Sequence, residues 1–318
     1  MDFLHDFDAE LKILMLSLEE SILNYPDYFK EDAAKFLSAY NILDTNFNKN
    51  HLSFLLPYWI KKPLNLNDEA CSRISRGFIP ALFYFLVQDS VMDTVPGEYK
   101  GDRLPLGNLF LLDFLEQYRA LFSSGSSFWK YFNCYFTQWA NSVTWEQREY
   151  MNQSRVYSKE DLLLVAQKAA PLKIITAAAC ILSEKPEFIH ELSSTVDHLV
   201  ITFQMMDDLS DWKEDILQGN CTYFLSLVME YCNIRELSSI NSSHVRDALF
   251  FGDVLDKILK VAEENYEFIV NTTSHRYPYL EAYHISLYNQ LKSFHHNISE
   301  KKSNKLQGGF IDLLNKAK

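Results

Sequence analysis

The stretch FQMMDDLSDWKED, residues 203 to 215, places five aspartates and glutamates within nine positions, directly after an apolar run. The apolar residues before it recur at spacings of three and four, which predicts one face of a helix. At that period Asp207, Asp211 and Asp215 fall at i, i+4 and i+8, one above another. Like charges at this spacing repel, and a carboxylate beside apolar residues also loses hydration. A bound divalent cation would offset both costs, because hard cations prefer carboxylate oxygens. The alternative is a solvated acidic face, which is what most charge runs are.

The composition favours one large helical domain. The chain has 318 residues, 47% of them hydrophobic, and its nine glycines and nine prolines are too few for a turn-rich β architecture. The net charge of −12 and the absence of a Lys/Arg stripe argue against a nucleic-acid partner. Five scattered cysteines without CxxC pairs are typical of a reduced protein. The longest uncharged apolar stretch, residues 77–87, is too short to span a bilayer, and the N-terminus has no basic leader. We therefore expect a cytoplasmic protein with no membrane span.

Helical periodicity continues along nearly the whole chain. Short polar segments interrupt it, which predicts ten or eleven helices within one domain, residues 1–318. One long helix is expected to begin after an N-cap at Asn67 and to run to about Asp93. The basic segment 299–318 is expected to be a flexible tail or a lid.

Another helix is expected in the second half of the chain, from Ser158 to Leu182. Ser158 and Asp161 have the spacing of a capping box, which predicts a helix start there. The pattern continues past Pro171, where a kink is expected, and ends at Leu182.

A second acidic helix end matches the first. The segment ALFYFLVQDSVMD, residues 81 to 93, again closes an apolar run with acids, here Asp89 and Asp93 at i and i+4. Taken alone, such a pair is usually the end of a helix running into solvent. If the two acidic helices are packed neighbours, their carboxylates face each other across a cavity. That arrangement would make a site for several Mg²⁺ ions that hold a diphosphate.

These segments resemble the motifs of the class I isoprenoid synthases, that is, the trans-prenyl diphosphate synthases and terpene synthases. FQMMDDLSDWKED is similar to their second aspartate-rich motif, FQxxDDxxD, and FYFLVQDSVMD resembles their first. QKAAPLKIITAAACIL, residues 167–182, resembles the helix that carries K-T-x-x-L, and DILQGNCTYFLSLV, residues 215–228, resembles D-x-x-x-G-K-x-T. The resemblance implies an all-α, single-domain helical bundle with a central cavity. We also expect a homodimer.

The resemblance also implies which residues form the site. The expected metal ligands are the aspartates of both motifs: Asp89, Asp93, Asp207, Asp208, Asp211 and Asp215. The expected catalytic residues are Asp89, Asp93, Asp207, Asp211 and Lys168, and the expected substrate contacts are Lys168, Gln204, Tyr84, Phe85, Phe203 and Arg155. The expected cofactor is Mg²⁺, as three ions, with Mn²⁺ as an alternative.

Two aromatic residues are expected to limit the length of the substrate. In the resembled synthases, the positions four and five before the leading aspartate of the first motif form the pocket floor, and here they are Phe85 and Tyr84. Two rings at the floor favour a C10 or C15 prenyl diphosphate over longer ones. Ordinary core packing is the alternative for either ring, because aromatic residues at helical spacing usually only pack.

Departures from the family pattern separate its members. Ser90 replaces the middle aspartate of the first motif, Ala169 replaces the threonine after Lys168, and Asn220 replaces the lysine of G-K-x-T. The Arg-Arg-Gly of chain-elongating members is missing after the first motif, and so is the Gly-Gly-Lys-x-x-Arg that grips isopentenyl diphosphate.

The departures favour a Mg²⁺-dependent terpene synthase. Such an enzyme ionises an allylic prenyl diphosphate, cyclises or quenches the carbocation, and releases diphosphate. Residues 207–215 also satisfy the spacing of the second metal motif of terpene synthases, so this stretch fits both groups. The alternatives are a trans-prenyltransferase, which elongates a chain or prenylates another acceptor, and a non-catalytic partner subunit of a prenyl synthase.

Overall fold

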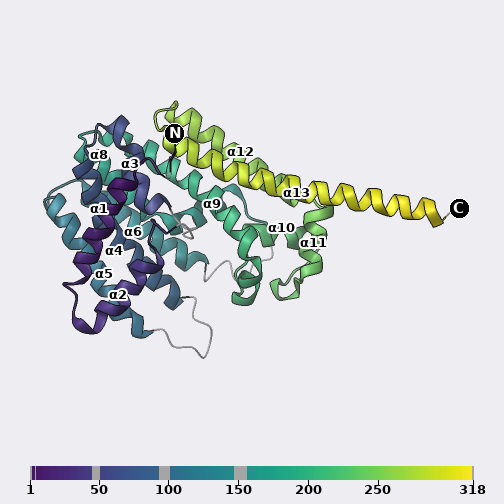
Figure 1. Cartoon of the computed structure of the whole chain (residues 1–318), viewed down its shortest axis with the longest axis horizontal. Helices are drawn as coiled ribbons and strands as arrows, with labels where there is room; N and C mark the ends of the chain where they lie inside the picture. The colour runs from purple at the N-terminus through teal and green to yellow at the C-terminus, as the bar shows by residue number, and fades with distance from the viewer. Residues whose placement is uncertain (1, 4, 45–50, 93–100, 147–155, 317–318) are drawn as a thin grey trace. The chain divides into compact units, whose positions relative to one another are not determined.

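The computed structural model describes residues 2–3, 5–44, 51–92, 101–146 and 156–316, with side chains as far as residue 303. These residues contain thirteen α-helices, four short 3₁₀-helices and no strand (Figure 1). The all-α prediction is confirmed, and the expected number of ten or eleven helices was too low. The chain divides into two compact units. Unit 1 comprises Met1–Ala140, Lys168–Val196 and Thr273–Ala282, and unit 2 comprises Asn141–Gln167, Asp197–Thr272 and Tyr283–Lys318.

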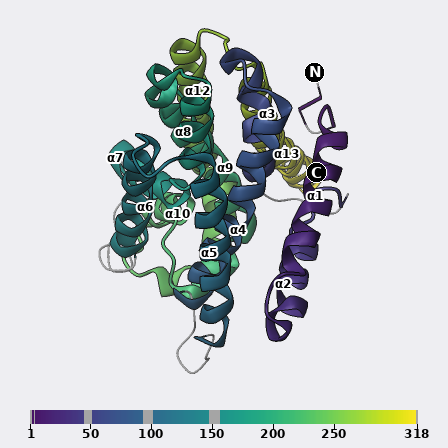
Figure 2. The same ribbon diagram turned by 90° about the vertical axis from the view of Figure 1, so that its left-hand side faces the viewer.

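Unit 1 is built around one long helix, α4. Its elements are α1 (Asp8–Ile22), α2 (Asp27–Ala39), α3 (His51–Leu64), α4 (Asp68–Met92), η1 (Gly101–Arg103), α5 (Leu104–Leu121), most of α6 (Phe128–Trp145), α8 (Leu172–Leu182) and η4 (Pro186–Phe188). Helix α4 packs against α1, α3, α5 and α8, and Figure 2 shows it beside α5. The contact with α5 is close because Gly77 has no side chain: a Cβ there would lie 2.7 Å from Cε2 of Tyr118.

Unit 2 contains the remaining helices. These are α7 (Lys159–Ala166), the larger part of α9 (Ile189–Gln218), α10 (Tyr223–Cys232), η5 (Leu237–Ser239), α11 (Ser242–Phe251), α12 (Val254–Thr273) and α13 (Pro278–Lys316) from residue 283 onward. The segment 299–318, expected to be a tail or lid, continues α13 as far as Lys316. Its role stays a prediction.

A chain of buried polar side chains joins three helices of unit 2. His198 on α9 lies 2.7 Å from the Oδ1 of Asn265 on α12, whose Nδ2 donates to Thr202 at 3.0 Å. The Oγ1 of Thr202 lies 2.9 Å from Nε2 of His284 on α13, and His284 is fully buried. Burial lowers the pKa of both histidines, that of His284 to about 4. Both rings therefore serve as neutral members of a hydrogen-bonded core.

The helix starts predicted from capping residues are confirmed. The Oδ1 of Asn67 accepts a hydrogen bond from the backbone N–H of Ala70 at 2.8 Å, so α4 begins where its N-cap predicts. At the start of α7, the Oγ of Ser158 accepts from the N–H of Asp161, and the Asp161 carboxylate accepts from the N–H of Ser158. This reciprocal pair is the expected capping box.

The helix expected to bend at Pro171 is broken instead. Helix α7 ends at Ala166, the 3₁₀ turn η3 (Gln167–Ala169) follows, and α8 begins at Leu172. Proline lacks an N–H and disfavours helical geometry in the residue before it, so the ladder of helical hydrogen bonds stops here. The break places Lys168 on a short turn rather than inside a helix.

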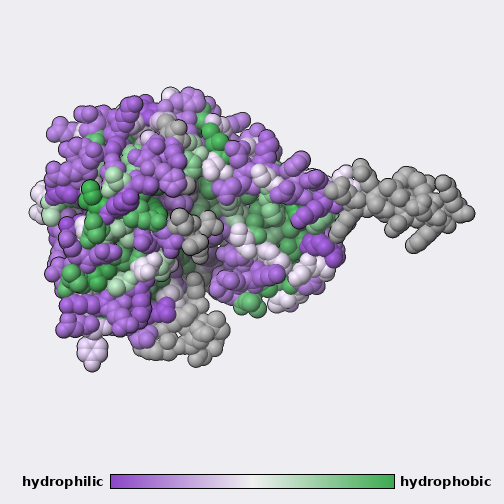
Figure 3. Space-filling view, viewed as in Figure 1, coloured by the Kyte–Doolittle hydropathy of each residue, from purple (hydrophilic) through white to green (hydrophobic). Residues whose placement is uncertain are grey.

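Some apolar side chains are exposed on the described surface. The described residues contain no single helix that could span a membrane. On unit 1, Ile13 and Leu16 of α1 and Leu112 of α5 are each more than half exposed, and Figure 3 shows hydrophobic residues scattered among hydrophilic ones. Over the described residues, no single helix is long and apolar enough to cross a membrane. One broken pair, Lys159–Ala169 with Leu172–Leu182, reaches the required length and hydropathy only when its two parts are added.

Candidate active site

The first aspartate motif lies in the last turn of α4, in unit 1. Asp89 and Ser90 are both half-buried. The hydroxyl of Ser90 donates a hydrogen bond to the carbonyl of Val87 at 2.9 Å, a common arrangement for serine inside a helix. Asp93, the other predicted ligand of this motif, lies outside the described residues. Of the two predicted ligands in this motif, the structure therefore describes Asp89, which follows the apolar run of α4.

The second aspartate motif forms a stripe on α9, in unit 2. Asp207, Asp211 and Asp215 are all half-buried and follow one another along one face. At 1.5 Å per residue the outer two are about 12 Å apart along the helix. Among the described residues no three His, Cys, Asp or Glu side chains gather closely enough to hold a metal ion.

Such an open stripe still fits the expected cation. Mg²⁺ usually takes one or two carboxylates and completes its shell with water and substrate phosphates, rather than binding in an all-protein cage. The oxygen donors of the stripe are of the right kind for that mode. The stripe therefore offers oxygen ligands of the kind that Mg²⁺ prefers, although it does not form a preformed metal cage.

Asp208 differs from its neighbours, because it is buried and bound within the protein. Only 3% of its surface is exposed, and its Oδ1 accepts a hydrogen bond from Nε2 of Gln204 at 3.0 Å. Burial raises the pKa of Asp208 to about 7, while hydrogen bonds from Gln204 and the backbone N–H of Phe224 oppose the shift. Phe224 lies in the first turn of α10, whose N–H groups have no partner within the helix. Asp208 therefore joins α9 to the N-terminus of α10.

The two lysines around Pro171 have opposite environments. Lys168 is exposed on the turn η3. Lys173, in the first turn of α8, is only 2% exposed and its Nζ lies 5.3 Å from the ring centroid of Tyr135. The hydroxyl of Tyr135 in turn lies 2.6 Å from that of Ser193. Sequence analysis missed this buried cation, although a lysine in the otherwise apolar LKIITAAACIL is unusual.

The two rings predicted to form the pocket floor belong to an aromatic cluster in unit 1. Phe85 is 7% exposed, and its ring lies 4.8 Å from that of Trp139 and 5.5 Å from that of Phe136 on α6. Tyr84 is half-buried, and its ring stacks on Phe136 at 6.1 Å. Sequence analysis did not single out Phe136 and Trp139, although aromatic residues recur at helical spacing along α6. Tyr84 is the ring of the predicted floor that keeps substantial exposed surface.

The other predicted contacts are less well defined. Phe203 is half-buried on α9, in unit 2, and Arg155 lies outside the described residues. Arg276 forms an ion pair with Glu191, and its guanidinium carbon lies 4.5 Å from the ring centroid of Phe188. Arg276 therefore serves the packing of unit 1. The prediction that the two aspartate motifs face one cavity stays a prediction, because Asp89 belongs to unit 1 and the α9 stripe to unit 2.

Comparison with known proteins gives matches at the level of structure. No protein-family model and no curated protein sequence matches the chain. A geranylgeranyl pyrophosphate synthetase from the archaeon Geoglobus acetivorans is similar with a TM-score of 0.71 and 16% identity, over 89% of this chain and 99% of that one. A geranylgeranyl pyrophosphate synthase from Lactobacillus brevis gives a TM-score of 0.71 and 12% identity, over 90% and 97% of the two chains.

A third similar structure is a decaprenyl diphosphate synthase from Rhodobacter capsulatus. Its TM-score is 0.69 at 14% identity, over 91% of this chain and 97% of that one. Identities this low establish the fold alone. The chain has the all-α class I isoprenoid synthase fold that its two aspartate motifs predict.

Proposed function

We propose that this protein is a Mg²⁺-dependent class I isoprenoid synthase that ionises an allylic prenyl diphosphate and transfers its prenyl group to an acceptor. The observation that carries the proposal is the stripe Asp207, Asp211 and Asp215 at the end of a buried helical face, in a chain with this fold. Its carboxylate oxygens are half-buried, follow one another along one helix face, and are donors of the kind that Mg²⁺ prefers.

The residues of the chain have distinct roles in this proposal. Asp89, Asp93 and the α9 stripe would supply the ligands for three Mg²⁺ ions, with Mn²⁺ as a substitute. Bound there, the ions would neutralise the charge that develops on the departing diphosphate. Lys168, exposed on its turn, would add charge-assisted hydrogen bonds to the same group.

Other residues would shape and support the pocket. Tyr84, with Phe85 behind it, would close the far end against long prenyl tails, and Phe203 would add an aromatic face. An allylic cation needs such a dry, aromatic surrounding, because water would quench it early. Asp208 and Gln204 would position the stripe by fixing α9 against α10.

Prenyl transfer is preferred here over the terpene synthase reaction that the sequence motifs favour. The three similar structures are all called prenyl diphosphate or pyrophosphate synthases or synthetases, which supports prenyl transfer. Terpene cyclisation remains the second candidate, because the motifs that grip isopentenyl diphosphate are missing and Ala169 and Asn220 replace two further diphosphate contacts. Without that grip, the acceptor in a transfer reaction need not be isopentenyl diphosphate.

Product analysis with labelled substrates tests the proposal. The protein is incubated with C10, C15 or C20 allylic diphosphate and Mg²⁺, with and without isotope-labelled isopentenyl diphosphate. Mg²⁺-dependent consumption of the allylic diphosphate supports the proposal. A cyclic or hydroxylated hydrocarbon made without any acceptor would move the protein to the terpene synthases. No consumption at any length, in a folded sample, would leave the non-catalytic subunit as the better explanation.

A further inference from the structure

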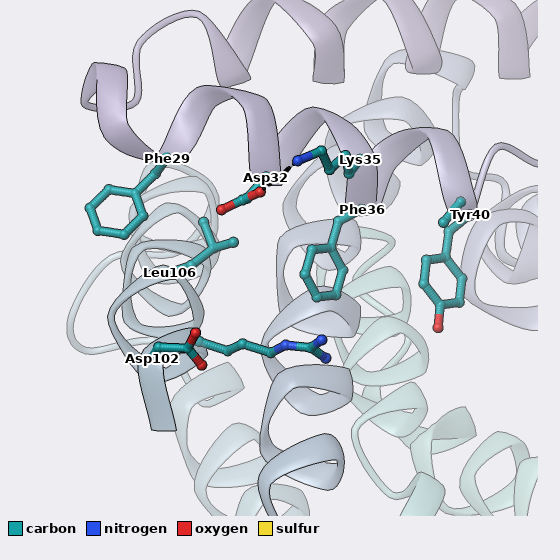
Figure 4. Close-up of a pocket in the computed structure, with 9 residues that line it drawn as sticks. Phe29, Asp32, Lys35, Phe36, Tyr40, Asp102 and Leu106 are labelled. Atoms are coloured by element: carbon teal, nitrogen blue, oxygen red, sulfur yellow. Dashed lines mark hydrogen bonds and ion pairs between the residues drawn. The ribbon is translucent and has the colours of Figure 1, made fainter. Parts of the chain in front are cut away.

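A pocket of about 370 Å³ lies on unit 1 between α2 and the start of α5. This volume is at the lower end of the range found for small-molecule sites. Figure 4 shows the rings of Phe29, Phe36 and Tyr40 on one side of α2 and its C-cap, with Leu106 and Asp102 across from the first part of that row. One wall of the pocket is thus a row of aromatic rings.

The charges in this pocket are balanced. The ammonium of Lys35 lies 2.9 Å from a carboxylate oxygen of Glu31 and 3.1 Å from one of Asp32. Asp102 and Arg103, next to each other on η1, add one charge of each sign. A diphosphate needs several cationic or N–H partners before it leaves water. The pocket therefore suits a ligand with a planar apolar body better than it suits a diphosphate.

Two rings of the pocket contact α4, the helix that carries the first aspartate motif. The rings of Phe36 and Tyr40 lie 5.8 Å and 6.0 Å from that of Phe83 on α4, the helix that carries Asp89. Phe83 and Asp89 are separated by about 9 Å along that helix. A ligand that lies against Tyr40 is therefore one aromatic ring away from the helix that carries Asp89.

We propose that this pocket binds the acceptor of the prenyl group, and that the acceptor is an electron-rich aromatic compound without a diphosphate. The inference rests on the proposed function, because it needs an allylic cation formed beside Asp89. Aromatic side chains stack on planar ligands and on each other through the same offset or edge-to-face contacts.

The transfer step balances as an electrophilic substitution on the ring. The C1–O bond of the allylic diphosphate breaks, and its electron pair leaves with the diphosphate. A pair of π electrons from the acceptor ring forms a C–C bond to C1. The substituted ring carbon then loses its proton to water, which restores aromaticity.

Ala39 offers a way to fill the pocket without damaging the core. It is exposed and lines the pocket at the last position of α2, whereas Ala34 is exposed on the same helix and does not line it. Ala39→Trp should therefore block the pocket, Ala39→Leu should block it in part, and Ala34→Trp is the matched control. The donor is the C15 allylic diphosphate with Mg²⁺, and the acceptor probes are indole and 4-hydroxybenzoate.

Two readouts separate the inference from the proposed function. Release of inorganic diphosphate from the donor alone reports ionisation, and mass spectrometry of the prenylated probe reports transfer. We expect wild type and Ala34→Trp to prenylate at least one probe. Ala39→Trp should make at least about tenfold less prenylated probe than wild type, and Ala39→Leu should make an intermediate amount. The rate of diphosphate release from the donor alone should be unchanged in both variants.

Three results would overturn the inference alone, and a fourth would reject the proposed function as well. Diphosphate release without a prenylated probe in wild type would leave the proposed function standing and remove the aromatic acceptor. Equal product from Ala39→Trp and wild type would show that the acceptor enters elsewhere. If wild type instead adds isopentenyl diphosphate to the donor, and Ala39→Trp abolishes that reaction, then the pocket binds the acceptor but the acceptor is a diphosphate. No diphosphate release from any donor would instead reject the proposed function, and the inference with it.

Discussion

Replacing Tyr84 by alanine should shift the preference of the enzyme toward longer prenyl diphosphates. Tyr84 is half-buried, whereas Phe85 is almost fully buried against Trp139, so the Tyr84 ring is the part of the predicted floor that a substrate tail can reach. Removing a ring that blocks the tail relieves an overpacking cost on the order of 1–3 kcal/mol, which is about one to two decades in the preference between C20 and C15.

The stability cost of the same substitution is small enough for the assay. Tyr84→Ala loses ring contacts at 5.1 Å, 6.1 Å and 6.5 Å, and because the residue is half-exposed we expect a loss of about 1–2 kcal/mol in the free energy of unfolding. Phe85→Ala, which empties a buried position, should cost about 3–5 kcal/mol. The two variants therefore separate a floor from a core position.

The assay compares kcat/KM for C10, C15 and C20 allylic diphosphates by diphosphate release. Tyr84→Phe is the matched control, because it keeps the ring and removes only the hydroxyl, and its preference should equal that of wild type. A Tyr84→Ala enzyme that loses activity equally at every length would show that the ring packs against α6 and does not touch the substrate. A wild type that already prefers C20 would refute the floor as well.

Two further predictions concern stability. The pKa of His284 is lowered to about 4 from an unfolded value near 6.5, so the unfolded chain binds the extra proton between these pH values. The neutral His284 ring therefore contributes fully to the free energy of unfolding above pH 6.5. That contribution falls as the pH is lowered, by up to about 3 kcal/mol at pH 4. In urea unfolding, the free energy of His284→Gln should depend less on pH between 4 and 6.5 than that of wild type. An equal pH dependence would contradict the lowered pKa of His284. Gly77→Ala should cost about 1–3 kcal/mol because the new Cβ meets the buried ring of Tyr118, whereas Gly125→Ala, with no heavy atom within 4 Å, should be neutral by thermal melting. Equal melting temperatures for these two variants would contradict the close α4–α5 contact.

Much of the fold follows from local sequence patterns. The spacing of apolar residues and the caps at Asn67 and Ser158 predict α4 and α7 at the residues where they begin. The break at Pro171 was expected as a bend, because proline in a helical pattern either kinks or ends a helix, and the sequence does not say which. Caps and prolines act within one turn, and such local effects are readable without a structure.

The site is less predictable, because its chemistry depends on contacts between distant segments. The spacing in DDLSD gives Asp207 and Asp208 equal standing, yet Asp208 is buried against α10 and its neighbour is half-exposed. Phe136 and Trp139 become partners of Phe85 only through the packing of α6 on α4. Neither fact is encoded in the periodicity of a single helix.

The most direct test of the proposed chemistry is the release of inorganic diphosphate from the C15 allylic diphosphate by Asp207→Asn. Lys213→Gln is the control, because Lys213 is exposed on the same helix and its position, six residues after Asp207, lies on the face opposite the stripe. We predict that wild type and Lys213→Gln release diphosphate only when Mg²⁺ is present, and that Asp207→Asn, folded by its melting curve, is slower by about 10²-fold or more. Release that continues in excess chelator, or at the wild-type rate in Asp207→Asn, would contradict a metal-dependent ionisation at this stripe.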